Sequence, residues 1–304
     1  MSIIQLIESK ISDLSFDERP IIVISGPTGI GKSNLAISLA KKINGVIINA
    51  DSMQIYKELK IISSQPSDRD KKIISHELYG IKSIYQKFSV MDWLELVEEK
   101  LDVIFNKNKI PIIVGGTGLY IKSAINGISK IPKVDNEVFE KCSKLFDKIG
   151  ILEFRKLVEE VDKDFTEKNI DKQRLIRAYS VYLQTGKAIS EWYKSSNISK
   201  IYNTFFSILL EQDREKNYKN CENRFEEFIN KGAIAEVKFL KDKNFDRSLP
   251  GFKCLGVNWI LKYLEKEITL EEAILLSKRD TRRYIKRQLT WFRHNFNPDL
   301  ILSI

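Results

Sequence analysis

The sequence predicts an α/β fold: a core with a mostly parallel β-sheet flanked by helices, plus an inserted helical domain. Short runs of β-branched apolar residues, typical of buried parallel strands, alternate with helical patterns in the first part of the chain. A glycine-rich segment joins the first of these runs to a helix. A long polar and helix-rich stretch then precedes one further apolar run.

The apolar runs define the expected strands. The first covers residues 20–25 and the second residues 46–50, with a helix over 34–43 between them. Such a βαβ unit implies parallel strands with a right-handed crossover. A helix over 90–106 and a strand over 110–114 continue the alternation.

The chain changes character after a helix that begins near Leu119. Residues 129–202 are polar, charged and helical, and an apolar run over 203–210 indicates one more core strand. We therefore expect a core formed by residues 1–128 and 203–304, and a helical insertion formed by residues 129–202. Helices are expected to fill the chain after the last strand.

Composition and charge narrow the functional class only mildly. The 304 residues carry a formal net charge of +9, which indicates either a polyanionic partner such as nucleic acid or simply a lysine-rich composition. Three dispersed cysteines and two histidines favour neither a zinc site nor a disulfide framework. No apolar stretch approaches the roughly 20 residues that span a bilayer, and no signal-peptide pattern begins the chain. We expect a cytoplasmic monomer without a membrane segment.

The turn between the first strand and the first core helix matches a P-loop. In a P-loop, backbone N–H groups wrap a phosphate, the lysine adds a charge and the following hydroxyl can bind Mg²⁺. The alternative is a glycine-rich turn with a solvated lysine. The motif does not identify the phosphate compound. The expected phosphate-binding residues are Gly26, Pro27, Thr28, Gly29, Ile30, Gly31, Lys32 and Ser33, with Ser33 as the metal-binding hydroxyl.

The acid that a P-loop NTPase needs at the end of a second strand is not where we would expect it. The 110–114 strand runs into glycines, whereas Asp51 follows the 46–50 strand. Because ligands of open parallel sheets lie at the carboxyl ends of strands, Asp51, Thr117 and the P-loop should meet in one crevice. Each side chain has a plainer alternative as a helix cap. Beside a P-loop, Asp51 is better explained as a base or metal ligand, while both readings of Thr117 stay open.

Five segments together resemble the tRNA dimethylallyltransferase (tRNA isopentenyltransferase) family, in its bacterial form. They occur in the family's order and span nearly the whole chain. The P-loop alone is generic, whereas Asp-Ser-x-Gln, Gly-Gly-Thr-Gly-Leu-Tyr and Lys-Arg-Gln-Leu-Thr-Trp are far more specific. The segments are the P-loop and residues 49–56, 114–120, 171–178 and 286–293.

The resemblance implies transfer of a dimethylallyl group from dimethylallyl diphosphate to N6 of the adenosine 3′-adjacent to the anticodon of tRNA, with release of pyrophosphate. It implies Mg²⁺ on Ser33, and Arg214 is the alternative to Arg224 on the diphosphate. Either arginine could instead be a surface cation. The residues implied in catalysis are Asp51 as general base, Thr117, Lys32 and Arg224.

The resemblance also implies the anticodon stem-loop as partner, with the target nucleotide extruded from its stack. Residues 278–287 hold six cations and one acid, and are expected either to contact RNA or to form a solvated helix face. Gln173 and Arg177 lie one helical turn apart and should share a face. The residues implied in tRNA binding are Asp51, Ser52, Met53, Gln54, Gln173, Arg174, Leu175, Ile176 and Arg177.

The chain departs from the family pattern at four positions. Gln65 replaces a lysine, Glu77 replaces a histidine, and Val257 and Asn258 replace a tyrosine and an arginine. Two other hypotheses stay open: a P-loop small-molecule kinase with a helical lid, and an RNA-binding module that has lost catalysis. The intact catalytic motifs argue against the second.

Overall fold

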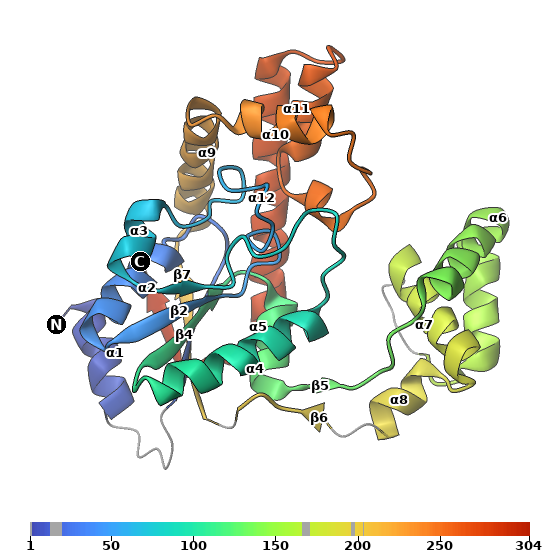
Figure 1. Cartoon of the computed structure of the whole chain (residues 1–304), viewed down its shortest axis with the longest axis horizontal. Helices are drawn as coiled ribbons and strands as arrows, with labels where there is room; N and C mark the ends of the chain where they lie inside the picture. Colours follow the sequence, from blue (N-terminus) through green and yellow to red (C-terminus); the bar gives the residue numbers. More distant parts are fainter. Residues whose placement is uncertain (1, 13–19, 166–170, 196–197, 203) are drawn as a thin grey trace. The chain divides into compact units, whose positions relative to one another are not determined.

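The computed structural model divides the chain into two compact units (Figure 1), residues 1–125 with 201–304, and residues 126–200. The insertion that we expected at residues 129–202 overlaps the second unit. Residue 203, where we expected the last core strand to begin, lies outside the described residues. The structure describes residues 2–12, 20–165, 171–195, 198–202 and 204–304.

The first unit is built on a six-stranded sheet of order β3-β2-β4-β1-β7-β8. Every neighbouring pair in this sheet is parallel, which confirms the expected parallel α/β core. The carboxyl ends of β2, β4 and β1 are therefore adjacent along one edge. The strands are β1 (Ile21–Ser25), β2 (Gly45–Asn49), β3 (His76–Glu77), β4 (Ile110–Gly115), β7 (Phe205–Glu211) and β8 (Leu300–Ser303).

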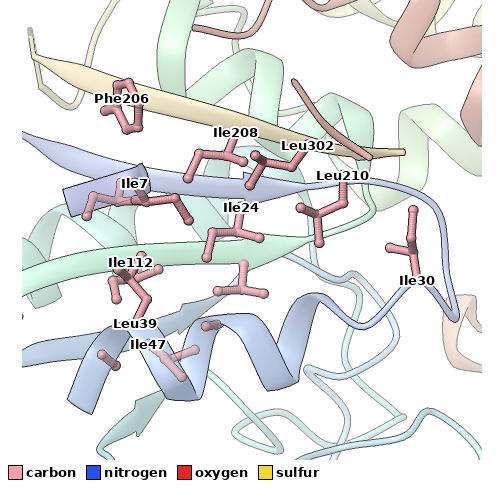
Figure 2. Packing of buried hydrophobic residues seen from close by; sticks show 14 residues of the cluster. Ile7, Ile24, Ile30, Leu39, Ile47, Ile112, Phe206, Ile208, Leu210 and Leu302 are labelled. Carbon is pink, nitrogen blue, oxygen red and sulfur yellow. The ribbon is translucent and has the colours of Figure 1, made fainter. Parts of the chain in front are cut away.

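Both faces of the sheet are buried, which explains why its central strands read as continuous apolar runs. Figure 2 shows one face, where Ile24 and Ile112 from the strands pack with Ile7 of α1 (Ile3–Ser12) and Leu39 of α2 (Lys32–Lys42). On the opposite face, α4 (Val90–Asn106) packs against β4. The indole of Trp93 in α4 donates a hydrogen bond to the carbonyl of Asn49 at 2.7 Å, which ties that helix to the end of β2.

The expected elements agree with the structure in the core and fail near the end of the chain. The helix expected over 90–106 has those bounds, because Ser89 caps its first turn in a capping box with Asp92. Helices were expected to fill the chain after β7, and this was wrong at β8. That strand buries only Leu302, so the sequence offers too little apolar pattern to predict it.

The remaining helices of the first unit follow β2, β4 and β7. Figure 1 shows α9, α10, α11 and α12 grouped together, with the long α12 running back past the sheet. Thr269 begins α12 with a capping box formed with Glu272. These helices are α3 (Asp68–Ile73), α5 (Gly118–Asn126), α9 (Arg214–Asn230), α10 (Ala233–Asp242), α11 (Val257–Leu264) and α12 (Leu270–Asn295), with a 3₁₀ turn at Pro250–Lys253.

The second unit is helical and has a core of its own. Its buried side chains include Phe154 and Val158 of α6 and Leu175 and Val181 of α7, and α6 bends at Gly150. Two short antiparallel strands begin and end the unit. Its elements are β5 (Ile128–Ser129), α6 (Asn136–Val161), α7 (Lys172–Thr185), α8 (Ile189–Ser195) and β6 (Ile198–Ser199).

Two further features bear on the expectations from composition. Within the described ranges, none of the helices combines the length and apolar character needed to cross a membrane. The three cysteines, Cys142, Cys221 and Cys254, are free and buried.

Candidate active site

The P-loop begins where β1 ends and includes the first two residues of α2, Lys32 and Ser33. Gly26, Gly29 and Gly31 all have positive φ, and Gly31 precedes the helix in a left-handed conformation. A Cβ on Gly29 would lie 2.2 Å from the sulfur of Cys221, so a side chain there would collide with α9. The side chain of Ile30 packs into the hydrophobic core beside the sheet, which holds the loop in place (Figure 2).

Lys32 is the charged residue of the loop itself. Its Nζ donates hydrogen bonds to the carbonyls of Gly26 at 2.9 Å and Pro27 at 2.8 Å. Burial lowers the pKa of Lys32 to about 8, an effect that Asp51 opposes and Arg224 reinforces. The ammonium group is thus held in place by the loop, and it loses its charge as the pH rises through about 8.

Arg224 of α9 joins the P-loop from the opposite side. Its Nη2 donates a hydrogen bond to the hydroxyl of Thr28 at 2.7 Å. Its guanidinium lies over the ring of Phe228, 5.5 Å from the centroid. Arg214, the alternative, is largely exposed and pairs with Glu215 instead. The geometry therefore favours Arg224 for contact with a bound diphosphate.

Asp51 is fixed by the turn that follows β2. Its Oδ1 accepts a hydrogen bond from the N–H of Met53 at 2.9 Å, and its own N–H donates to Oδ1 of Asn49 at 2.8 Å. The side chain therefore closes an Asx turn and caps no helix. Asn49, which is fully buried, also donates to the carbonyls of Asp51 and Leu78.

Thr117 lies beside this turn. Its hydroxyl accepts a hydrogen bond from the N–H of Ser52 at 3.0 Å, and its own N–H donates to the carbonyl of Ala50 at 3.3 Å. The side chain thus contacts the residue next to Asp51 and links the end of β4 to the end of β2.

Two pockets meet at Asp51 and Arg224. The first, here called the P-loop pocket, has a volume of about 290 Å³ and lies over Gly29, Gly31, Lys32 and Ser33. The second, here called the aromatic pocket, has a volume of about 300 Å³ and includes Phe225, Phe228 and Tyr284. The residues that line both pockets are Thr28, Asp51, Ser63, Ser64 and Arg224.

The segment of Asp51 to Gln54 faces these pockets as a whole. Gln54 lines the P-loop pocket, while Ser52 and Met53 line the aromatic pocket. The amide of Gln54 donates hydrogen bonds to the carbonyls of Ser63 and Ser64, each at 2.9 Å. One side chain therefore supports part of the wall that the two pockets share.

Glu236 of α10 holds the same wall and was not found by sequence reasoning. Its carboxylate accepts hydrogen bonds from the N–H groups of Ile61 at 2.8 Å and Ile62 at 2.9 Å. Burial raises the pKa of Glu236, and these backbone donors oppose the rise. An isolated glutamate on an amphipathic helix carries no sequence signal for such a contact. Asn49 could have been found, since it lies within the segment that carries Asp51.

Three of the four departures from the family pattern have local explanations, and nothing in the structure explains the exposed Asn258. Gln65 donates to the carbonyl of Tyr56 at 2.8 Å, so it braces the turn in which it lies. Glu77 forms an ion pair with Lys100 at 2.8 Å. Val257 is buried at the start of α11, next to Asn258.

Within the second unit, α7 divides its predicted tRNA-binding residues between two environments. Leu175 and Ile176 are buried in the core of the unit, so their side chains are not open to a partner. Gln173, Arg174 and Arg177 line one pocket of about 460 Å³, which agrees with a shared face. Arg177 donates from Nη2 to the carbonyl of Pro132 at 3.1 Å.

The basic stretch on α12 is less open than the sequence suggested. Lys278 pairs with Glu226 of α9 at 2.5 Å, and Arg282 pairs with Glu222 of the same helix. These two cations therefore bind α9, since α9 places its acids beside them. Arg287 remains exposed and lines the aromatic pocket.

Comparison with known proteins identifies the family. A sequence model described as IPP transferase matches residues 54–295, and one described as Isopentenyl transferase matches residues 19–85. The chain belongs to the IPP transferase family. A tRNA dimethylallyltransferase of Pelagibacter ubique is 44% identical over 281 residues, covering 91% of this chain and 89% of the relative. One from Rickettsia bellii is 40% identical over 291 residues, covering 94% and 91%.

Solved structures of the family share the fold. A eukaryotic dimethylallyltransferase acting on tRNA has a TM-score of 0.81 and 26% identity, covering 94% of this chain and 74% of that one. The tRNA isopentenylpyrophosphate transferase of Bacillus halodurans has a TM-score of 0.67 and 28% identity, covering 94% and 90%. These matches support a prenyl transferase and give no support to the kinase alternative.

Proposed function

We propose that this protein transfers a dimethylallyl group from dimethylallyl diphosphate to N6 of the adenosine 3′-adjacent to the anticodon in tRNA. The observation that carries this proposal is the meeting of two pockets at Asp51, Thr28 and Arg224. A diphosphate in the P-loop pocket and an adenine in the aromatic pocket would react where these side chains stand. The reaction belongs in the cytoplasm, where tRNA is modified.

The reaction exchanges one bond for another. The C1–O bond of the donor breaks, the bond between C1 and N6 forms, and the N6 proton passes to Asp51 as general base. The amine is a poor nucleophile because the adenine ring delocalises its lone pair, so a carboxylate within reach is needed. One oxygen of Asp51 is engaged by Met53, which holds the carboxylate in orientation.

The leaving pyrophosphate gains charge as the C1–O bond breaks. The P-loop N–H groups, the ammonium of Lys32 and the guanidinium of Arg224 are the groups positioned to stabilise that charge. Thr117 lines neither pocket, so its hydroxyl would act through the Asp51 turn, where it accepts the hydrogen bond from the N–H of Ser52. These donors are preorganised, because Lys32 and Arg224 are already hydrogen-bonded to the loop.

Mg²⁺ fits this site as a companion of the diphosphate. No group of three or more His, Cys, Asp or Glu side chains that could hold a metal occurs in the described part of the chain. Mg²⁺ commonly keeps several waters and binds substrate phosphates with few protein ligands. The Ser33 hydroxyl, which lines the P-loop pocket, would hold it, and the ion would neutralise part of the pyrophosphate charge.

The tRNA anticodon stem-loop is the proposed macromolecular partner. Ser52, Met53 and Gln54 would contact the extruded nucleotide at the pockets, and the exposed Gln173 and Arg174 of α7 would contact RNA. Leu175 and Ile176 would support that helix from within its core, and Arg177 would act from the same pocket as Gln173.

A direct assay tests the function. The protein is incubated with Mg²⁺, radiolabelled dimethylallyl diphosphate and a tRNA that carries adenosine 3′ of its anticodon. We expect label on the RNA and none when that adenosine is replaced by guanosine. Hydrolysis of ATP without RNA labelling would instead support the kinase reading, and salt-sensitive tRNA binding without transfer would support a binding module.

A further inference from the structure

Gln288 of α12 connects two segments that lie far from it in the sequence. Its Oε1 accepts a hydrogen bond from the N–H of Thr28 at 2.9 Å, and its Nε2 donates to the carbonyl of Gly116 at 2.8 Å. The side chain is only 6% exposed. A buried amide with both ends satisfied is costly to disturb, because either partner would be left without a hydrogen bond.

The two segments are the ones that carry the reaction. Thr28 belongs to the P-loop, and its hydroxyl also accepts the hydrogen bond from Arg224. Gly116 immediately precedes Thr117, whose hydroxyl holds the N–H of Ser52. Gln288 therefore joins the diphosphate side of the site to the side that bears Asp51.

The space around Gly116 is shaped by this contact. A Cβ on Gly116 would lie 2.5 Å from Nε2 of Gln288, and 3.2 Å from the carbonyl oxygen of Gly26. The segment after β4 can approach the P-loop this closely only without a side chain. The amide of Gln288 then fills the gap with one bond to each segment.

An amide matches both partners, and an ionised carboxylate does not. Thr28 offers an N–H donor and Gly116 a carbonyl acceptor, so the orientation of the Gln288 amide is fixed by its neighbours. A carboxylate would keep the acceptor for Thr28 but would face the Gly116 carbonyl with a second oxygen. A methionine would keep the approximate volume and lose both hydrogen bonds.

We propose that Gln288 is a positioning residue. It fixes the position of the P-loop relative to the strand ends that bear Thr117 and Asp51. This inference rests on the proposed transfer reaction. It also assigns the Thr28 N–H to Gln288, which leaves the later N–H groups of the loop for phosphate. Transfer needs the donor carbon and the acceptor amine in line. A small shift of the P-loop relative to Asp51 should therefore slow the chemical step more than it weakens binding.

Gln288→Met tests the proposal, with Thr290→Met, an exposed position on the same helix, as the matched control. We expect single-turnover transfer to fall about 10- to 100-fold in Gln288→Met. Pyrophosphate affinity, measured by calorimetry, should fall much less. Thermal unfolding and circular dichroism establish the folded fraction, so rates are compared per folded molecule. Transfer within about twofold of the control would overturn the proposal.

Gln288→Glu separates positioning from a merely structural role through its pH profile. A protonated glutamate can donate to Gly116 and accept from Thr28, whereas a carboxylate can only accept. The single-turnover rate, divided at each pH by that of the natural protein, should therefore rise as the pH falls. A ratio independent of pH would overturn the inference. Absence of transfer by the natural protein would overturn the proposed function instead, so the two failures are distinct.

Discussion

The lowered pKa of Lys32 predicts that diphosphate capture weakens above pH 8. Burial among the P-loop groups lowers this pKa to about 8, so the acid dissociation constant of the ammonium is roughly 300-fold larger than that of an exposed lysine. The value of kcat/KM for dimethylallyl diphosphate reports the enzyme form to which the diphosphate binds. It should follow the protonated fraction of Lys32, which is about one half at pH 8 and about one tenth at pH 9 for a group with this pKa.

The assay measures kcat/KM for dimethylallyl diphosphate across this pH range, with saturating tRNA and Mg²⁺. Burial raises the pKa of Tyr79, Tyr284 and Cys221, which keeps these neighbours neutral further into alkaline pH. Lys32→Arg is the comparison, because a guanidinium stays charged throughout. Its absolute rate can differ, but its profile should lose the alkaline fall. A flat profile for the natural protein, or the same fall in Lys32→Arg, would refute the reasoning.

Three further substitutions probe the base, the metal-binding hydroxyl and the strand ends. Asp51→Asn keeps the acceptor for the N–H of Met53 but removes the base, so transfer should fall by roughly two to four orders of magnitude. The affinity for tRNA, measured by filter binding, should change little. Unchanged turnover would leave Asp51 only its turn-forming role. Ser33→Ala should raise the Mg²⁺ concentration needed for half-maximal transfer, and chelation of Mg²⁺ should abolish transfer by the natural protein. Identical Mg²⁺ titrations of the variant and the natural protein would show that Ser33 does not bind the metal. Gly115→Ala places a Cβ 2.0 Å from the Ala50 carbonyl oxygen, so urea denaturation should show a loss of about 1–3 kcal/mol or more, and equal midpoints would contradict the steric argument.

The strands of the core could be predicted because their burial leaves a direct trace in composition. In β1 and β4, side chains on both faces are buried, so nearly every position is apolar. β8 lacks this trace. It is held to β7 partly by Asp299, whose carboxylate accepts hydrogen bonds from the N–H and hydroxyl of Ser207. Such a pairing, 92 residues apart, is invisible to local patterns.

The residues of the candidate site also divide into those that the sequence could identify and those that it could not. Lys32 and Asp51 could be found, because each follows a strand at a fixed spacing. The resemblance implied Arg224 ahead of Arg214, but the residue pattern alone does not separate two arginines on one charged helix. In the structure, contact with Thr28 distinguishes Arg224. Gln288 lies in a segment that the resemblance singled out, yet its role depends on partners 260 and 172 residues away. Spacing within a motif cannot convey such contacts.

The position of the acid explains how a P-loop fold can serve transfer of a carbon group. In the sheet order, β4 lies between β2 and β1, so Asp51 begins one strand further from the P-loop than a neighbouring-strand acid would. β4 ends in Gly115, which leaves room for the Ala50 carbonyl to cross above it, at a place where a Cβ would lie 2.0 Å from that oxygen. The end of β2 can then lean over β4 and bring Asp51 into the P-loop pocket. Gly115 thus stands where a neighbouring-strand acid would lie, and it lets Asp51, the proposed base, line both the P-loop pocket and the aromatic pocket.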